Sequence, residues 1–324
     1  MAMLRLMSQL GKFHEVAGQP GVVNHKLIHI LSTFLYNEAK RGASFMDLTD
    51  ITNIKKTLKA FGAHTKKDLG QHFLIDEKAL DTIVETANLT KVDQIVEVGP
   101  GMGILTRELC KKAGTVIAVE LDTAMLTVVK TACIKYNNLI VENHDILKFD
   151  TSKLGKYKIV SNLPYYITSP VIRKFLEAEN KPEEMILLVQ REVAERIAAK
   201  PSRMSILAVS VQYYGAPTVV DVVPRTSFFP APRVDSAIIK IKVYKEPLFE
   251  AETKLFFRIV KSGFGEKRKQ LINSLAGGMQ MSRTDVERWL EKSGIDSQMR
   301  AEALSMTDWH RLYQGYQELF NEES

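Results

Sequence analysis

The chain has 324 residues and a formal net charge of +6; 45% of its residues are hydrophobic and 25% are charged, as in ordinary globular proteins. No apolar run approaches the length of a membrane span, so we expect no membrane association. Cys110 and Cys133 are the only cysteines, too few for a disulfide framework or a Cys-rich zinc site, so we predict a cytoplasmic protein without a metal site. The positive charge permits an acidic partner such as nucleic acid.

Residues 1–48 differ in character from the rest of the chain. The first 12 residues carry Arg5 and Lys12 but no acid, a pattern that leaves open an organelle-targeting peptide, a tag and a misplaced start, with Met46 as an alternative start. We treat this stretch as an N-terminal extension of unknown role. A helical pattern begins after Asp50, and a polar loop containing glycine follows it.

Strand and helix patterns alternate from residue 93 onward. Apolar strands are predicted at residues 94–98, 115–119, 139–141, 157–160 and 185–189. Helical periodicity falls at residues 77–87, 104–112, 123–136, 170–178, 192–199 and 204–214, and two more strands, 218–223 and 235–244, flank a Pro-rich loop. This order predicts a Rossmann-like, doubly wound α/β domain over residues 49–246.

Only helical patterns follow Pro247. They cover residues 253–262, 267–276, 283–293 and 305–320, so we predict a small all-helical C-terminal domain over residues 247–324. Within it, Lys267, Arg268 and Lys269 form a compact basic run. Such a run is either a solvated helix face or a surface that binds phosphates.

A glycine loop joins the first predicted strand of the sheet to its helix. Gly99, Gly101 and Gly103 allow the backbone to approach a ligand closely. A dinucleotide-binding loop needs Gly or Ala at position 104, which is Ile104, and Pro100 removes one of the N–H donors that a pyrophosphate needs. The loop therefore favours S-adenosylmethionine (SAM) over NAD, and a plain glycine turn stays open.

Acids follow the next two strands. Glu120 ends the second strand, about 20 residues beyond the glycine loop, where an acid accepts hydrogen bonds from both hydroxyls of a ribose. Asp145 lies just past the third strand and is either an acceptor for the exocyclic amine of a cofactor adenine or a turn cap. Glu97, inside the first strand, is placed to lie near the methionine end of SAM.

The fourth strand runs directly into Asn162, Leu163, Pro164 and Tyr165. Asn162 supplies a carbonyl acceptor, and Tyr165 supplies an aromatic face. Pro164 fixes its own φ and restricts Leu163 to an extended conformation, which would direct backbone carbonyls into a pocket. This combination suits the binding of a planar heterocyclic amine by its N–H edge and its face, although a lone string of this kind is more often a simple strand end.

Together, these motifs resemble the KsgA family of rRNA adenine N6,N6-dimethyltransferases, in order from about residue 50 to about residue 315. The matching stretches are Gly70-Gln71-His72-Phe73-Leu74, the glycine loop with Glu97, Glu120, Asp145, Asn162-Leu163-Pro164-Tyr165, and residues 190–196, 228–236, 267–273 and 300–305. Position 72 is usually Asn in that family, so the role of the His72 side chain is left open.

The resemblance implies methyl transfer from SAM to N6 of two adjacent adenines in the 3′-terminal hairpin loop of small-subunit (16S) rRNA, within the assembling 30S subunit. It implies a cofactor site formed by His72, Leu74, Gly99, Glu120, Asp145 and Asn162. We expect a monomer whose C-terminal helices select the ribosomal substrate and carry no chemistry.

The chemistry of an adenine amine explains the residues after the fourth strand. Its lone pair is conjugated into the ring, so two acceptors on its N–H groups, Asn162 Oδ1 and the Leu163 carbonyl, would favour a pyramidal nitrogen whose lone pair faces the methyl group. The base must leave its stack, and Tyr165 and Phe228 are the candidate stacking faces. We expect Phe228 to be exposed, because Thr226 and Ser227 precede it, although a hydrophobic plug under the Pro-rich loop is the alternative.

Other functions compete with this one. A resistance-type methyltransferase of large-subunit rRNA shares the catalytic motifs, but the matches past residue 260 disfavour it. A non-catalytic ribosome assembly factor with the same fold is disfavoured by the intact Asn162 and Glu120. Nothing in the sequence supports a DNA-recognition domain, and Pro100 and Ile104 disfavour an NAD-dependent dehydrogenase.

Overall fold

A computed structural model of the chain describes residues 48–61, 71–266 and 268–320. The predicted extension, apart from Leu48, lies outside these residues, and so do Gly70 and Lys267. The first described helix, α3 (Ile51–Ala60), begins after Asp50, whose carboxylate accepts hydrogen bonds from two backbone N–H groups of the first turn. In the part of the chain that is described, no helix combines the length and the apolar character needed to cross a membrane.

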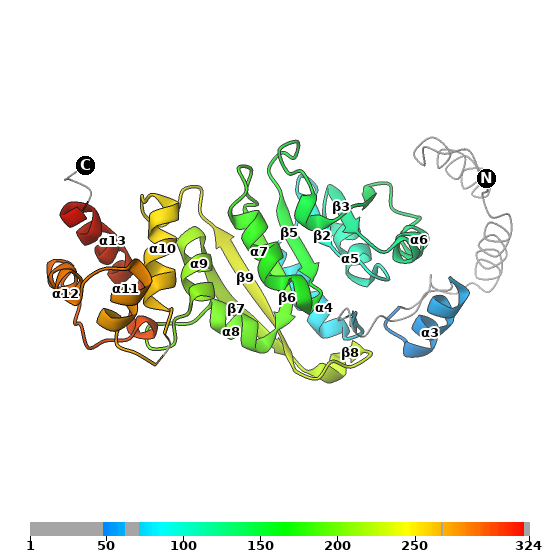
Figure 1. Ribbon diagram of the computed structural model, residues 1–324. Coiled ribbons are helices and arrows are strands. Elements are labelled where there is room, and N and C mark those ends of the chain that lie inside the picture. Colours follow the sequence, from blue (N-terminus) through cyan, green and yellow to red (C-terminus); the bar gives the residue numbers. More distant parts are fainter. Residues whose placement is uncertain (1–47, 62–70, 267, 321–324) are drawn as a thin grey trace, which may run out of the picture. The chain divides into compact units, whose positions relative to one another are not determined.

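A seven-stranded sheet forms the centre of the fold, in the spatial order β4-β3-β2-β5-β6-β9-β7 (Figure 1). Its strands are β2 (Gln94–Val98), β3 (Thr115–Glu120), β4 (Leu139–Asn143), β5 (Lys158–Asn162), β6 (Glu184–Gln190), β7 (Gly215–Val223) and β9 (Ser236–Val243). The first five strands of the order run parallel, whereas β9 is antiparallel to β6 and to β7. The predicted Rossmann-like α/β fold is confirmed.

Helices cover both faces of this sheet. They are α4 (Glu77–Ala87), α5 (Ile104–Lys112), α6 (Thr123–Ala132), α7 (Thr168–Leu176), α8 (Arg191–Ile197) and α9 (Ile206–Tyr214). Five consecutive residues of β6, from Met185 to Val189, are 0% exposed, so side chains on both faces of that strand are covered. Helix α6 ends four residues earlier than its pattern predicted, because the chain turns at Cys133 and Tyr136.

The chain order of the strands creates a switch point beside β2. The chain proceeds from β2 outward to β3 and β4, and then returns to the other side of β2 to form β5. In an open α/β sheet, ligands bind outside the carboxyl ends of the strands at such a point. The segments that follow β2, β3 and β5 therefore meet at one edge.

A two-stranded sheet that the sequence did not predict lies apart from the main sheet. Strand β1 (Phe73–Leu74) pairs antiparallel with β8 (Phe228–Phe229). Just beyond it, the Ile75 N–H donates to the Ser227 carbonyl at 2.9 Å, and the Ser227 hydroxyl donates to Asp76 at 2.6 Å. Asp76 also caps the start of α4. The segment before α4 is thereby joined to the Pro-rich segment before β9.

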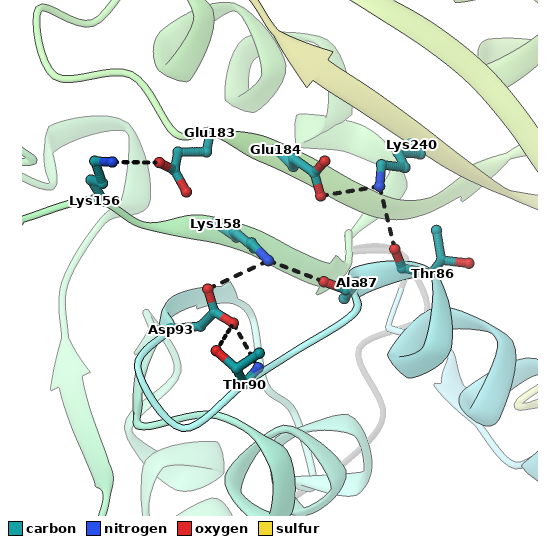
Figure 2. Close-up of polar contacts among 9 residues, drawn as sticks. All are labelled: Thr86, Ala87, Thr90, Asp93, Lys156, Lys158, Glu183, Glu184 and Lys240. Carbon is teal, nitrogen blue, oxygen red and sulfur yellow. Dashed lines mark hydrogen bonds and ion pairs between the residues drawn. The ribbon is translucent and has the colours of Figure 1, made fainter.

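Two lysines bind the other end of α4 (Figure 2). The Lys158 ammonium of β5 lies 3.3 Å from the Ala87 carbonyl and 3.4 Å from Asp93. The Lys240 ammonium of β9 lies 3.1 Å from Glu184 and 3.5 Å from the Thr86 carbonyl. Cations at a helix C-terminus satisfy its last carbonyls and complement its dipole. This fastens α4 to the sheet at the end away from the switch point.

Four helices follow the sheet: α10 (Thr253–Gly263), α11 (Leu271–Met279), α12 (Arg283–Lys292) and α13 (Met306–Phe320). Their existence was predicted, but the prediction that α11 starts at residue 267 is wrong. Gln270 is extended and Leu271 N–H bonds the Met299 carbonyl, so Arg268 and Lys269 lie in the turn before the helix. The helices share a hydrophobic core with the sheet region, in which the Phe256 ring stacks at 4.9 Å on Tyr213 of α9.

Candidate active site

A cavity of about 200 Å³ lies at the switch point. Its walls come from the segment around β1, from the ends of β2, β3 and β5, and from the start of α5. The lining residues are 71–74, 97, 99–102, 104, 105, 120–122 and 162–166. Segments far apart in the sequence thus form one site, as the switch point predicts.

The glycine loop forms the floor between β2 and α5. Gly99 and Gly101 have φ values of 64° and 53°, which side chains other than glycine rarely adopt. A Cβ atom on Gly101 would lie 3.2 Å from the Phe73 ring, so the loop also packs closely against β1. A hydrogen bond of 2.9 Å from the Gly103 N–H to the Pro100 carbonyl holds the two ends of the loop together.

Two buried carboxylates face the same cavity. Glu97 is 2% exposed and Glu120 is 9% exposed. Burial, with a contribution from the nearby Glu120 carboxylate, raises the pKa of Glu97 to about 8. Burial also raises the pKa of Glu120, against hydrogen bonds that include the Asp122 N–H at 2.9 Å. Burial thus favours the neutral form of both acids, and a bound cation would favour the ionised form.

The chemistry of this lining fits SAM better than a dinucleotide. Glu97 Oε2 has no hydrogen-bond partner among the described residues. None of the lining residues in the described ranges is Lys or Arg. A pyrophosphate would meet no cationic side chain among these lining residues, whereas the sulfonium and ammonium groups of SAM would favour the ionised form of the two acids.

Asn162 lines the cavity, and its amide is held in one orientation. The buried Ser161 hydroxyl donates to the Val98 carbonyl at 2.6 Å, which holds the end of β5 against β2. The Asn162 amide nitrogen then donates to the His72 carbonyl at 3.1 Å. Because Nδ2 is the donor of that bond, Oδ1 is the group of this amide that can accept a hydrogen bond from a ligand.

The neighbouring aromatic side chain is also held in place. The Tyr165 hydroxyl lies 2.7 Å from the Ser236 hydroxyl, and its ring centroid lies 5.5 Å from that of His72. Burial raises the pKa of Tyr165, against the hydrogen bond to Ser236. Tyr166 beside it is 57% exposed. The turn after β5 thus presents an acceptor and a fixed aromatic face together.

The structure brings most of the predicted site residues to the cavity. The predicted residues that line it are His72, Leu74, Gly99, Glu120, Asn162, Leu163, Pro164 and Tyr165. Asp145 does not line it, and instead its carboxylate accepts a hydrogen bond from the Leu147 N–H and caps a short 3-10 helix (Ile146–Lys148). That is the turn-cap alternative.

Phe228 does not line the cavity either. The prediction that it is exposed is wrong: it is 3% exposed, because it pairs with Leu74 in the two-stranded sheet, whereas Phe229 is half-buried. Sequence reasoning assigned no role to five other lining residues, Met102, Leu105, Leu121, Asp122 and Tyr166. Each lies within two residues of a recognised motif residue, and that proximity was the available signal.

Together, the fold and this cation-accepting cavity define a Rossmann-like, SAM-dependent methyltransferase. A model of the family described as "Ribosomal RNA adenine dimethylase" matches residues 62–318. The chain belongs to this family, and it is accordingly an rRNA adenine dimethyltransferase that uses SAM.

Named relatives and solved structures agree with this assignment. The chain is 44% identical, over 82% of its length and 92% of the relative's, to "Ribosomal RNA small subunit methyltransferase A" of Dehalococcoides mccartyi. It is 38% identical to the protein of the same name in Bacillus pumilus, over 82% of this chain and 96% of that one. The structure is similar to a dimethyladenosine transferase of Plasmodium falciparum, with a TM-score of 0.66, 27% identity and coverage of 76% and 98% of the two chains. It is also similar to the 23S rRNA methyltransferase ErmE, with a TM-score of 0.63, 30% identity and coverage of 75% and 98%.

Proposed function

We propose that this enzyme dimethylates N6 of two adjacent adenines in the 3′-terminal hairpin loop of small-subunit (16S) rRNA, within the assembling 30S subunit. The observation that carries the proposal is the Asn162 amide, whose nitrogen is held by the His72 carbonyl at 3.1 Å, beside a cavity suited to SAM. We propose that it acts as a monomer in the cytoplasm, where subunits assemble.

The relatives support the small subunit as the target. Those from Dehalococcoides mccartyi and Bacillus pumilus carry the words "small subunit" in their names, at 44% and 38% identity. The structural similarity to ErmE, at 30% identity, keeps the large-subunit alternative open to experiment. We propose that residues 247–324 form the helical domain that selects between these substrates and that residues 49–246 carry the chemistry.

In the proposed mechanism, the turn after β5 prepares the amine. Asn162 Oδ1 and the Leu163 carbonyl accept its two N–H groups, which favours a pyramidal nitrogen with an available lone pair. Bound in the cavity, SAM supplies a methyl group on a positively charged sulfur, already a good leaving group. The C–S bond would break as the N–C bond forms, leaving a neutral thioether, and the cationic methylated nitrogen would then release one proton to water. Positioning and electrostatics supply most of the rate enhancement, without a general base before the transfer.

The cofactor would be held by the floor and back of the cavity. Glu120 accepts hydrogen bonds from the ribose hydroxyls, and Glu97 faces the cationic methionine end. The backbone of Gly99, His72 and Leu74 borders the ligand. Asp145 does not line the cavity and caps its own turn, so its contact with the adenine amine stays a prediction.

The target base would stack on Tyr165. The Tyr165 hydroxyl lies 2.7 Å from the Ser236 hydroxyl, which holds the ring in place along the cavity wall. Because the ring is already held, it loses little conformational entropy when a base stacks on it. Phe228 was the other candidate. Its burial leaves Tyr165 as the stacking face that the cavity itself presents.

Methyl transfer to separated ribosomal subunits tests the proposal. Small and large subunits from cells that lack this enzyme are incubated with it and with methyl-labelled SAM, and the label is mapped by mass spectrometry. We expect N6,N6-dimethyladenine near the 3′ end of the small-subunit rRNA. Label on the large subunit would support the resistance-type alternative, and binding without transfer would support the assembly factor.

A further inference from the structure

His72 contacts three parts of the active site. Its backbone carbonyl accepts from Asn162 Nδ2 at 3.1 Å, and its ring lies 5.5 Å from the Tyr165 ring at an interplanar angle of 31°. Its Nδ1 atom lies 2.6 Å from the carbonyl oxygen of Pro230. A carbonyl oxygen can only accept, so Nδ1 carries the proton and donates it.

The bond to Pro230 attaches the Pro-rich segment to the cavity wall. That segment leaves β8 at Phe229 and enters β9 at Ser236. Tyr165 holds its far end through the Ser236 hydroxyl at 2.7 Å, and His72 holds its near end at Pro230. Both attachments come from residues that line the cavity. The segment therefore spans the target side of the site between two hydrogen bonds.

We propose that the side chain of His72 is a positioning residue of the target-base pocket, where its Nδ1–H sets the spacing between the Pro-rich segment and the turn that carries Asn162 and Tyr165. This inference rests on the proposed function, and it assigns the side chain to the RNA side of the cavity. Any contact that residue 72 makes with the cofactor is then left to its backbone.

The geometry of the donor makes the inference testable. In His72 the donating nitrogen is bonded directly to Cγ. In H72N the amide nitrogen is also bonded to Cγ and can replace that donor. In H72Q the same amide is one methylene farther from the backbone, so its nitrogen cannot occupy that position without moving the segment. The two variants thus carry the same chemical group and differ only in where it lies.

Steady-state methyl transfer to small subunits is measured for the wild type, H72N and H72Q, with SAM affinity by calorimetry and thermal unfolding in parallel. We expect H72Q to lower kcat about tenfold, the effect of one misplaced hydrogen bond, while KM changes little. We expect H72N to restore kcat to within about threefold of the wild type. SAM affinity and the unfolding midpoint should agree among the three proteins.

Two results would overturn the inference. Equal kcat values for all three proteins would show that the position of the donor is irrelevant. A loss of SAM affinity that parallels the loss of turnover would place the side chain on the cofactor side. A wild-type enzyme that methylates no small subunit, yet binds SAM, would instead refute the proposed function and this inference with it.

Discussion

Asn162 and Glu120 are the last residues of the two strands that flank β2, and both line the same cavity. Their tasks differ, because the Asn162 amide stands beside the aromatic turn whereas Glu120 is buried next to the glycine loop. Glu120 therefore belongs to cofactor binding in the proposed mechanism, and Asn162 belongs to the reacting amine.

Replacing Asn162 separates these two tasks. We predict that Asn162→Ala lowers kcat by about a hundredfold or more, because the lost acceptor acts on the amine as the transition state forms. SAM affinity should stay within about twofold of the wild-type value, since the cofactor's ribose meets Glu120 and its cationic end meets Glu97 in the proposed mechanism. Single-turnover methyl transfer and calorimetry measure the two effects. Normal turnover by the variant would remove Asn162 from the mechanism.

The buried acid Glu97 predicts a pH dependence. Its pKa of about 8 in the free protein means that it is largely protonated at neutral pH. A cationic ligand favours the ionised form, so SAM affinity should rise between about pH 6 and pH 8 as that form becomes available. Glu97→Gln should remove most of this rise. A rise of unchanged size in the variant would assign the titration to another group.

The raised pKa of Glu97 also predicts how the free energy of unfolding changes with pH. Its folded pKa lies above the unfolded value, so its stabilising contribution is present below about pH 4.5 and is lost as the pH rises toward about 8. Glu97→Gln should therefore gain stability relative to the wild type across that range, with no further gain above it. Urea unfolding of the SAM-free proteins at a series of pH values measures the difference.

Sequence patterns predicted the positions of some site residues better than those of others. Glu120 and Asn162 line the cavity because a residue at the carboxyl end of a parallel strand has little freedom in where it lies. Phe228 was misjudged because its burial depends on pairing with Leu74, a residue more than 150 positions earlier in the chain. No local pattern reports such a contact. The roles of all these residues stay predictions.

Helix α4 shows how one element is fixed at both ends. Asp76 caps its start and joins it to Ser227, while Lys158 and Lys240 bind its final carbonyls (Figure 2). The segment just before α4 lines the cavity. The lysines thus stabilise, from a distance, the element that leads out of the active site.

Removing one of these lysines tests their contribution. The Lys158 side chain is 14% exposed and its partner Asp93 is 17% exposed, so Lys158→Met leaves a largely buried carboxylate and a helix-end carbonyl without this donor. We predict a loss of about 1–3 kcal/mol in unfolding free energy. Lys156→Met is the matched control, because that side chain is 89% exposed and its ion pair with Glu183 should contribute about 0–1 kcal/mol. Equal urea midpoints for the two variants would contradict the prediction.

Helices with a long periodic sequence pattern were predicted with the right bounds, whereas the shortest strands were not predicted. The bounds of α4 and α5 match the predicted residues 77–87 and 104–112. The two-residue strands β1 and β8 carry no periodicity, so only the folded chain reveals them. The antiparallel direction of β9 likewise depends on which neighbours it pairs with, which the strand's own residues do not specify.

At the scale of the whole molecule, the C-terminal helices and the sheet region share one core. Phe256 of α10 is 0% exposed and contacts Tyr213 of α9, Phe249 and Tyr313 of α13. The substrate-selecting helices that we propose are therefore attached to the catalytic part by a continuous aromatic cluster. Such a cluster should make the two parts unfold together.

Two spectroscopic probes can test that coupling. Both tryptophans, Trp289 and Trp309, lie in the C-terminal helices, so fluorescence reports on that region while far-ultraviolet circular dichroism reports on the whole chain. We predict coincident urea transitions for the two probes. Phe256→Ala should lower the unfolding free energy by about 3–5 kcal/mol in both signals. Separate transitions would show that the two parts fold independently.

The central claim is that this enzyme makes N6,N6-dimethyladenine in small-subunit rRNA. Mass spectrometry of rRNA from cells with the gene, without it, and with only the Asn162→Ala form tests this claim most directly. We predict two adjacent dimethylated adenines in the 3′-terminal hairpin loop in the first case and unmodified adenines there in the other two. Unchanged dimethylation in cells without the gene, or modification confined to large-subunit rRNA, would contradict the claim.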